Sequence, residues 1–271
     1  MRIALGIEYD GSAFCGWQVQ PDMPTVQETL ESALKAFATV PISTVCAGRT
    51  DTGVHATHQV VDFEAPVNRP LSSWIRGVNT FLPVGVAVRW AKEVPDDFSA
   101  RFSATERIYE YWIYNHPVRS PLMQARAGWV FRPCDEEKMF EASRCLLGEH
   151  DFTSFRASEC QAKSPVRTMH EVSIKRAGSL IGIRLRANAF LHHMVRNIVG
   201  SLVYVGTGRE SVSWFEDVFN AKDRTLAAPT FAASGLYLVG VRYPAAPDLP
   251  FYSPTAWSEG VFGYPDETKI A

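Results

Sequence analysis

The sequence predicts an α+β protein made of two ferredoxin-like β-α-β-β-α-β halves, whose mixed or antiparallel sheets join and are flanked by helices. Three observations support this prediction: short runs of β-forming residues, apolar residues at helical spacing between them, and one order of elements repeated along the 271 residues. The halves share no obvious sequence identity, so only the order repeats. We place the boundaries at residues 1–104 and 105–245, followed by a tail of 246–271.

The first half is predicted to hold four strands and two helices. Residues 2–9 alternate weakly between apolar and polar and end at the turn Asp10-Gly11-Ser12, which indicates a strand. A helix is expected over 26–39, because Thr25 and Glu28 form a capping box ahead of apolar residues at helical spacing. The remaining predicted elements are strands over 42–47, 58–64 and 84–94 and a helix over 73–81.

The second half repeats this order. Side chains of residues 107–115 alternate between two faces, as in a strand, and 171–176 with 181–186 form a hairpin. Helices are predicted over 135–147, where Gly148 ends the helix, and over 191–205 and 214–221. Residues 235–243 form the last strand. The Pro-rich residues 244–271 are expected to be loose coil.

Composition excludes several classes of protein. No apolar run is long enough to cross a membrane, and the N-terminus becomes charged at Arg2 without a small-residue cleavage site, so we expect a cytoplasmic protein. The five cysteines contain no Cys-x-x-Cys, which argues against a zinc knuckle or redox pair. The net charge of −2 does not show how charge is distributed, since several arginines lie within residues 101–132. These arginines indicate either a basic face for phosphates or a mixed solvated surface.

The loop AGRTDTGVHA over residues 47–56 is the strongest candidate for chemistry. Its glycines allow tight turns and close approach of a ligand to the backbone. Asp51 lies two residues after Arg49, and a carboxylate near an arginine on a rigid loop can act as a nucleophile or base. The alternative is an Asx-turn, in which Asp51 only accepts hydrogen bonds from nearby amides.

Three other features have two interpretations each. Tyr109 lies in a strand whose aromatic residues either stack on nucleobases or fill the core of a sheet. Arg196 lies in an apolar helix and either pairs with a buried carboxylate or extends to solvent. Two histidine pairs lack a third ligand at a diagnostic spacing, so we predict no metal site. These pairs are His55 with His58 and His192 with His193.

Six segments in order along the chain resemble the tRNA pseudouridine synthase A family. They are YDGSAFCGWQ at 9–18, GRTDTGVHA at 48–56, FSATERIYEY at 102–111, HDFTSF at 150–155, FLHHMVRN at 190–197 and GLYL at 235–238. The segments span nearly the whole chain, and no functional position departs from the family pattern.

The resemblance implies a pseudouridine synthase fold with Asp51 as the catalytic carboxylate. It further implies that Tyr109 lies against the target base, that Arg196 pairs with Asp51 and that Arg49 helps to hold the displaced nucleotide. A homodimer without metal or cofactor is also implied. The implied substrate is the tRNA anticodon stem-loop, in which uridines at positions 38, 39 and 40 are isomerised.

This isomerisation breaks the bond from C1′ to N1 of uridine, turns the uracil and joins C1′ to C5. Asp51 can add to C6, attack C1′ or remove the C2′ proton, and the sequence leaves these three routes open. One alternative is a non-catalytic RNA-binding module of ferredoxin-like units, disfavoured because no Gly-Phe-Gly-Phe pattern is present. Another is a hydrolase with Asp51 as nucleophile, disfavoured because no Asp-x-Asp pair is present.

Overall fold

The computed structural model describes residues 1–258 and 260–262, which form two compact units. The first unit holds residues 1–105 and 237–253, and the second holds 106–236 and the described residues from 254 onward. The sequence-based division differs because it assigns the last strand, β10 (Leu236–Arg242), to the second half. Parallel pairing explains the difference, since Tyr237 of β10 lies beside His55 in the first unit.

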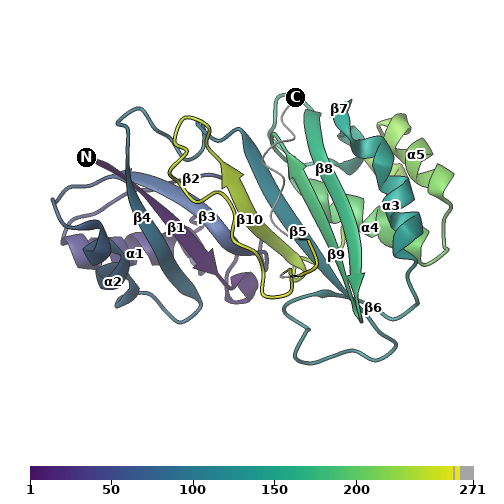
Figure 1. The fold of residues 1–271 in the computed structure, drawn as a ribbon, viewed down its shortest axis with the longest axis horizontal. Helices are drawn as coiled ribbons and strands as arrows, with labels where there is room; N and C mark the ends of the chain where they lie inside the picture. Colours follow the sequence, from purple (N-terminus) through teal and green to yellow (C-terminus); the bar gives the residue numbers. More distant parts are fainter. Residues whose placement is uncertain (259, 263–271) are drawn as a thin grey trace. The chain divides into compact units, whose positions relative to one another are not determined.

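The sheet of the first unit confirms the predicted order of strands and helices (Figure 1). Its strands are β1 (Arg2–Tyr9), β2 (Val45–Cys46), β3 (His55–Glu64) and β4 (Val86–Val94), together with β10. β1 pairs antiparallel with β3 and β4, and β2 pairs antiparallel with β3. Because β10 runs parallel to β3, the sheet is mixed.

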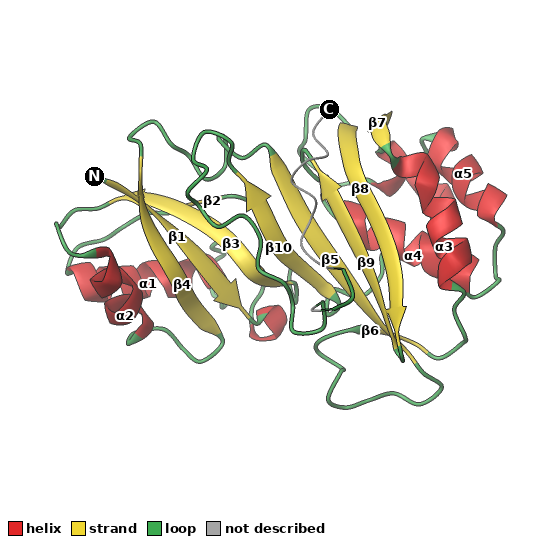
Figure 2. Ribbon diagram, viewed as in Figure 1, coloured by secondary structure: helices red, strands yellow, loops and turns green. Residues whose placement is uncertain are grey.

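The helices of the first unit, α1 (Val26–Ala38) and α2 (Leu71–Asn79), lie side by side (Figure 2). Their contact is aromatic, with the rings of Phe37 and Trp74 centred 5.0 Å apart. The predicted capping box is wrong. Thr25 is the N-cap residue, but its buried hydroxyl has no hydrogen-bond partner within the described part of the chain. Its carbonyl instead accepts a hydrogen bond from the Thr29 hydroxyl.

The strands of the second unit pair in the order β5-β9-β8-β7 in antiparallel fashion, and β6 pairs parallel to β5. Its strands are β5 (Glu106–Asn115), β6 (Gly128–Val130), β7 (Gly148–Asp151), β8 (Val166–Ala177) and β9 (Leu180–Ala187). The short strands β6 and β7 were not predicted. β5 and β9 match the expected positions within a residue at each end, whereas β8 begins at Val166, earlier than the predicted start at 171.

Helices α3 (Glu136–Ser143), α4 (Met194–Gly206) and α5 (Val212–Ala221) pack together in the second unit (Figure 2). α3 is shorter than predicted because its last turn is a 3-10 helix, η2 (Arg144–Leu146). Three further 3-10 helices are η1 (Gly11–Ala13), η3 (Thr153–Phe155) and η4 (Arg224–Leu226). Among the described residues, no helix is both long and apolar enough to cross a bilayer.

Part of the tail is packed, so the expectation of loose coil is wrong there. Thr255 is buried, and its hydroxyl donates a hydrogen bond to Glu110 at 3.1 Å. Glu110 also pairs with Arg184 at 2.9 Å, and both charged groups are buried. An uncompensated charge at this depth would be costly, so the pair and the covering tail depend on one another. Residues 263–271 of the predicted coil lie outside the described part.

Candidate active site

The loop that carries Asp51 is fixed at its start by a neighbouring strand. The amide of Ala47 donates to the carbonyl of Val60 at 2.8 Å. The side chain of Gln59, which is fully buried, then holds both backbone groups of Gly48: its Nε2 donates to the carbonyl at 2.5 Å, and its Oε1 accepts from the amide at 3.3 Å. The loop therefore leaves β2 along a path that β3 defines.

The segment that follows β1 holds the residue immediately before Asp51. The hydroxyl groups of Tyr9 and Thr50 lie 2.7 Å apart, and both side chains are buried. The carbonyl of Thr50 accepts a hydrogen bond from the amide of Trp17 at 3.0 Å. Both the side chain and the main chain of Thr50 are thus held, which limits the conformations open to Asp51.

The far side of the loop is a turn. The amide of Val54 donates to the carbonyl of Asp51 at 3.1 Å, and Gly53 has a φ of 78°, a left-handed conformation that glycine adopts without strain. His55 follows, buried against the ring of Tyr237 at 4.6 Å. Its Nδ1 accepts a hydrogen bond from the amide of Gly11 at 3.0 Å. This histidine is therefore a structural support of the loop.

Asp51 is half-buried on this braced turn, and Arg49 on the same loop is exposed. Both therefore remain partly accessible to a ligand. The nearest thiol in the sequence is a poor competitor as nucleophile, because burial raises the pKa of Cys46 to about 11. At neutral pH that thiol is protonated, and a thiol needs to lose its proton to attack. The carboxylate of Asp51 is the better-suited reactive group of the loop.

The second unit places Tyr109 in β5. Its side chain is 9% exposed and meets the ring of Phe190 edge to face, with centroids 5.0 Å apart. Phe190 lies in the connection that leads to α4. Contact with one ring at its edge holds the orientation of Tyr109, and an oriented ring is what stacking on a base requires.

Arg196 lies in the first turn of α4, where its guanidinium is held by the segment before β10. Its Nε donates to the carbonyl of Phe231 at 2.9 Å, and the amide of Phe231 donates to the carbonyl of Arg196 at 3.2 Å. The side chain is half-buried. These two hydrogen bonds favour an arginine that is held in place over one that simply extends to solvent from the outer face of the helix.

A buried polar network fixes the segment that holds Arg196. Asn197, which is fully buried, accepts hydrogen bonds at its Oδ1 from the hydroxyl of Thr230 at 2.7 Å and from Arg224 at 3.0 Å. Its Nδ2 donates to the carbonyl of Phe155 at 2.9 Å. Thr230 directly precedes Phe231, so this network determines where the carbonyl that binds Arg196 lies. Nothing in our sequence analysis predicted it, although Asn197 closes one of the six family-like segments.

The pairing of Asp51 with Arg196 remains a prediction, as do the roles of Tyr109 and Arg49. Two arginines of the second unit are held in ion pairs. Arg176 pairs with Glu136 at 2.8 Å, and Arg186 pairs with Glu106 at 2.9 Å. These arginines stabilise the second unit and are not part of a basic surface.

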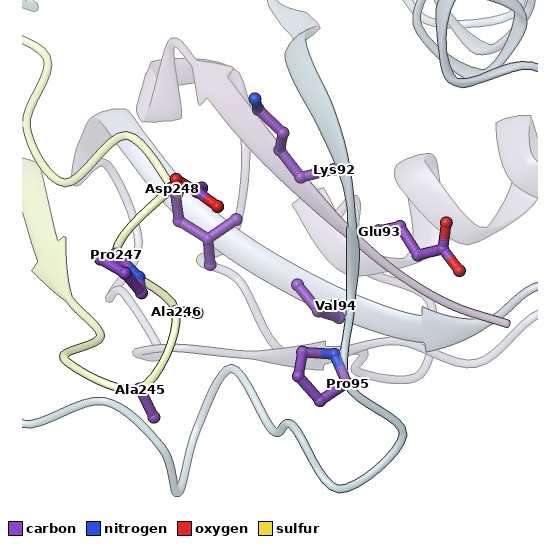
Figure 3. A pocket seen from close by; sticks show the side chains of 9 residues that line it. Lys92, Glu93, Val94, Pro95, Ala245, Ala246, Pro247 and Asp248 are labelled. Atoms are coloured by element: carbon purple, nitrogen blue, oxygen red, sulfur yellow. The ribbon is translucent and has the colours of Figure 1, made fainter.

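A cavity of about 400 Å³ in the first unit lies away from the Asp51 loop (Figure 3). It is lined by the end of β4, including Lys92, by Pro95 directly after that strand, and by residues 245–249. The end of β4 pairs with the start of β1, where Val94 lies beside Arg2. The Asp51 loop is adjacent to the opposite end of β1, where Tyr9 is held. This cavity is therefore separate from the candidate active site.

Together, the α+β fold and the braced loop that presents a carboxylate suit an enzyme whose chemistry is carried by an acidic side chain. A sequence model described as tRNA pseudouridine synthase matches residues 6–103 and 142–244. The chain belongs to this family, whose members convert uridine to pseudouridine.

Proteins named tRNA pseudouridine synthase A are similar over most of the chain. Those of Burkholderia cenocepacia (strain HI2424) and Burkholderia multivorans (strain ATCC 17616 / 249) are 59% identical over 245 residues, which is 90% of this chain and 91% of each relative. The protein of Paraburkholderia phymatum is 58% identical over 243 residues, with the same coverage. The predicted family and the predicted enzyme class, an isomerase, are confirmed.

Proposed function

We propose that this enzyme isomerises uridines at positions 38, 39 and 40 of the tRNA anticodon stem-loop, with the Asp51 carboxylate acting directly on the target nucleotide. The observation that carries the proposal is the bracing of the Asp51 loop. Thr50 on one side and Gly53 on the other are fixed, while Asp51 stays half-buried and accessible. Such pre-organisation lets a carboxylate act without first being positioned.

The other proposed residues serve the binding of an extruded nucleotide. A uridine in a helix must leave its stack before the bond from C1′ to N1 can be replaced by one from C1′ to C5, at a cost of a few kcal/mol. Stacking of the base on Tyr109 would return about 1–3 kcal/mol of this cost. The hydroxyl group at the edge of the Tyr109 ring would take part in proton transfer at C5. Arg49, exposed beside Asp51, is suited to hold the displaced nucleotide. We assign it that role.

Arg196 is proposed to pair with Asp51. This pairing accounts for a held arginine near the start of an apolar helix, because a buried guanidinium needs a carboxylate. It would also place a positive charge beside the carboxylate that addition to C6, attack at C1′ and removal of the C2′ proton all use. The reaction is an isomerisation with no net oxidation or reduction: C5 loses a proton to solvent as it bonds to C1′ and N1 takes one up, so proton transfer by side chains is sufficient and the proposal includes neither a cofactor nor a metal.

The proposal also includes a homodimer and a cytoplasmic location, both of which follow from the resemblance and from the tRNA substrate. Sedimentation velocity at micromolar protein would report the dimer. A single species with the mass of one chain, at every concentration tested, would reject it.

The experiment that tests the site assignment compares Arg196→Met and Tyr109→Leu with wild type on full-length tRNA. Pseudouridine is mapped at each anticodon-arm position, and RNA affinity is measured in parallel. We expect Arg196→Met to bind RNA normally but to form product much more slowly. Tyr109→Leu should lose stacking as well as turnover, while Tyr109→Phe should keep base binding. Wild-type turnover by Arg196→Met would remove Arg196 from the mechanism.

A further inference from the structure

Four aromatic side chains at the end of β5 and β6 form a surface that the proposed uridine site does not use. We call them the aromatic platform: Tyr114, His116, Trp129 and Phe131. Trp129 is 45% exposed and Phe131 is 57% exposed. Large exposed aromatic residues on adjoining strands are unusual in a soluble protein and commonly mark a binding surface.

Strand pairing builds the platform. β6 runs parallel to β5 with Trp129 directly beside Tyr114, so the two rings lie on the same face of the sheet. Along each strand the next residue on that face is also aromatic. Tyr114 and His116 stack with centroids 5.5 Å apart, and Trp129 and Phe131 lie 6.2 Å apart. The result is a two-by-two array of rings.

Hydrogen bonds hold the array in place. The indole Nε1 of Trp129 donates to the carbonyl of His116 at 2.8 Å. The side chain of Asn115 donates to the carbonyls of Val130 at 3.0 Å and Arg132 at 2.7 Å. These bonds fix residues 129–132 against the end of β5. A pre-formed array loses little conformational entropy when it binds a ligand.

A shallow pocket of about 280 Å³ opens beside the array. Tyr114, Trp129 and Met123 line it with apolar groups, and Arg119 and Ser234 line it with polar ones. A flat apolar wall with a guanidinium at the edge suits a nucleobase with its phosphate. The base stacks on the ring, and the phosphate accepts hydrogen bonds from the arginine.

The charge of the surrounding segment has one sign. Residues 116–133 contain Arg119, Arg126 and Arg132, and no aspartate or glutamate. All three arginines are exposed, and the guanidinium of Arg132 lies 5.7 Å from the ring centre of Phe131. A polyanion would be attracted to such a surface.

We propose that the aromatic platform is a second RNA-binding site, which holds an unpaired nucleotide of the tRNA substrate outside the uridine pocket. The inference rests on the proposed function for its ligand. Tyr109 and Tyr114 point to opposite faces of β5 and are separated by roughly 16 Å along the strand, at ~3.3 Å per residue. The platform therefore holds a different nucleotide from the one that is isomerised.

Self-association through the platform is the competing use of an apolar surface. A two-fold contact places the same surface of both copies together. It would bring the arginines of one copy towards those of the other, with no carboxylate between residues 116 and 133 to offset them. Charge therefore favours RNA over a second copy of the chain.

The test measures the affinity of the full chain for a tRNA transcript and for the isolated anticodon stem-loop. Trp129→Ala removes the stacking ring and is expected to raise Kd by roughly 5- to 150-fold, which corresponds to the usual worth of stacking one base. Trp129→Phe keeps a ring and should stay within about threefold of wild type. The matched control is Phe140→Ala on α3, since Phe140 is also 44% exposed but lies outside the platform.

Single-turnover rates at saturating RNA should be unchanged in Trp129→Ala, because Trp129 does not contact the target uridine. A loss of affinity for the full tRNA alone would place the nucleotide outside the anticodon arm, and a loss for both RNAs would place it inside. Equal affinity of Trp129→Ala and wild type for both RNAs would overturn the proposal. So would a change from dimer to monomer without any change in RNA binding.

Arg119→Glu provides a second test if Trp129→Ala does not fold, and it should weaken binding in a salt-dependent manner. Wild-type affinity in that variant would also count against the platform. The proposed function fails separately: a wild-type enzyme that binds tRNA but forms no pseudouridine would reject the reaction and leave the binding comparison intact.

Discussion

Gly16 is the position at which a single methyl group would test the bracing of the Asp51 loop. Its φ is +87°, and a Cβ built there would lie 2.8 Å from the carbonyl oxygen of Thr50. Contacts of a Cβ are ordinary from 3.4 Å upward, so Gly16→Ala must push the two segments about 0.6 Å apart. Thr50 directly precedes Asp51, and the shift is passed to the carboxylate.

Two effects of Gly16→Ala can be sized. A non-glycine residue in the left-handed region costs about 1–2 kcal/mol of stability. A displacement of 1 Å at a catalytic group can cost roughly 100-fold in rate. The shift at Asp51 is about half of that displacement, and half of the logarithm of a 100-fold loss is a loss of roughly tenfold in kcat. The affinity for tRNA should change little, because Gly16 is not proposed to contact RNA.

Gly208→Ala is the matched control, because Gly208 has a φ of +71° but nothing lies within 4 Å of its added Cβ. Both variants should lose a similar free energy of unfolding, measured by urea denaturation. Only Gly16→Ala should lose kcat, measured as tritium release from tRNA labelled at uridine C5. A Gly16→Ala enzyme with the kcat of wild type would show that the segment after β1 does not position Asp51.

Two further predictions concern buried groups. Thr230→Val removes the hydroxyl that binds Asn197, and it should lower kcat by roughly tenfold with RNA affinity unchanged. Thr230→Ser keeps the hydroxyl and should have the activity of wild type. Equal kcat in wild type, Thr230→Val and Thr230→Ser would reject a role of Thr230 in positioning Arg196. Burial lowers the pKa of His58 from 6.5 to about 4, so the unfolded chain takes up a proton that the folded chain refuses. The free energy of unfolding should therefore fall by about 3 kcal/mol between pH 6.5 and 4, and His58→Gln should flatten that slope in urea titrations at several pH values.

The elements that local sequence determines were predicted well. α1 ends at Ala38 and β4 at Val94, each within a residue of the predicted end, because apolar spacing and flanking turns specify them. Strands that form only against distant partners were either not predicted or predicted with the wrong length. β6 forms only because Gly128–Val130 lies beside Ile113–Asn115, and a three-residue run carries no periodic signal.

The same distinction applies to the candidate site. Asp51 and Arg49 stand out in the sequence because glycines and a carboxylate gather in one loop. The groups that hold this loop do not stand out, since Tyr9 and Trp17 lie more than 30 residues away and contact it only after folding. The hydrogen bond from Arg196 to the carbonyl of Phe231 could not be predicted either, because backbone acceptors have no sequence signature.

The most direct test of the central claim is the reaction of Asp51→Asn with C5-tritiated tRNA under single-turnover conditions, with enzyme in excess. The amide is nearly the same size as the carboxylate but can neither attack carbon nor accept the proton. We predict wild-type affinity for the tRNA and no tritium release above background. Release at the wild-type rate by a purified Asp51→Asn enzyme would contradict the assignment of Asp51 as the catalytic group.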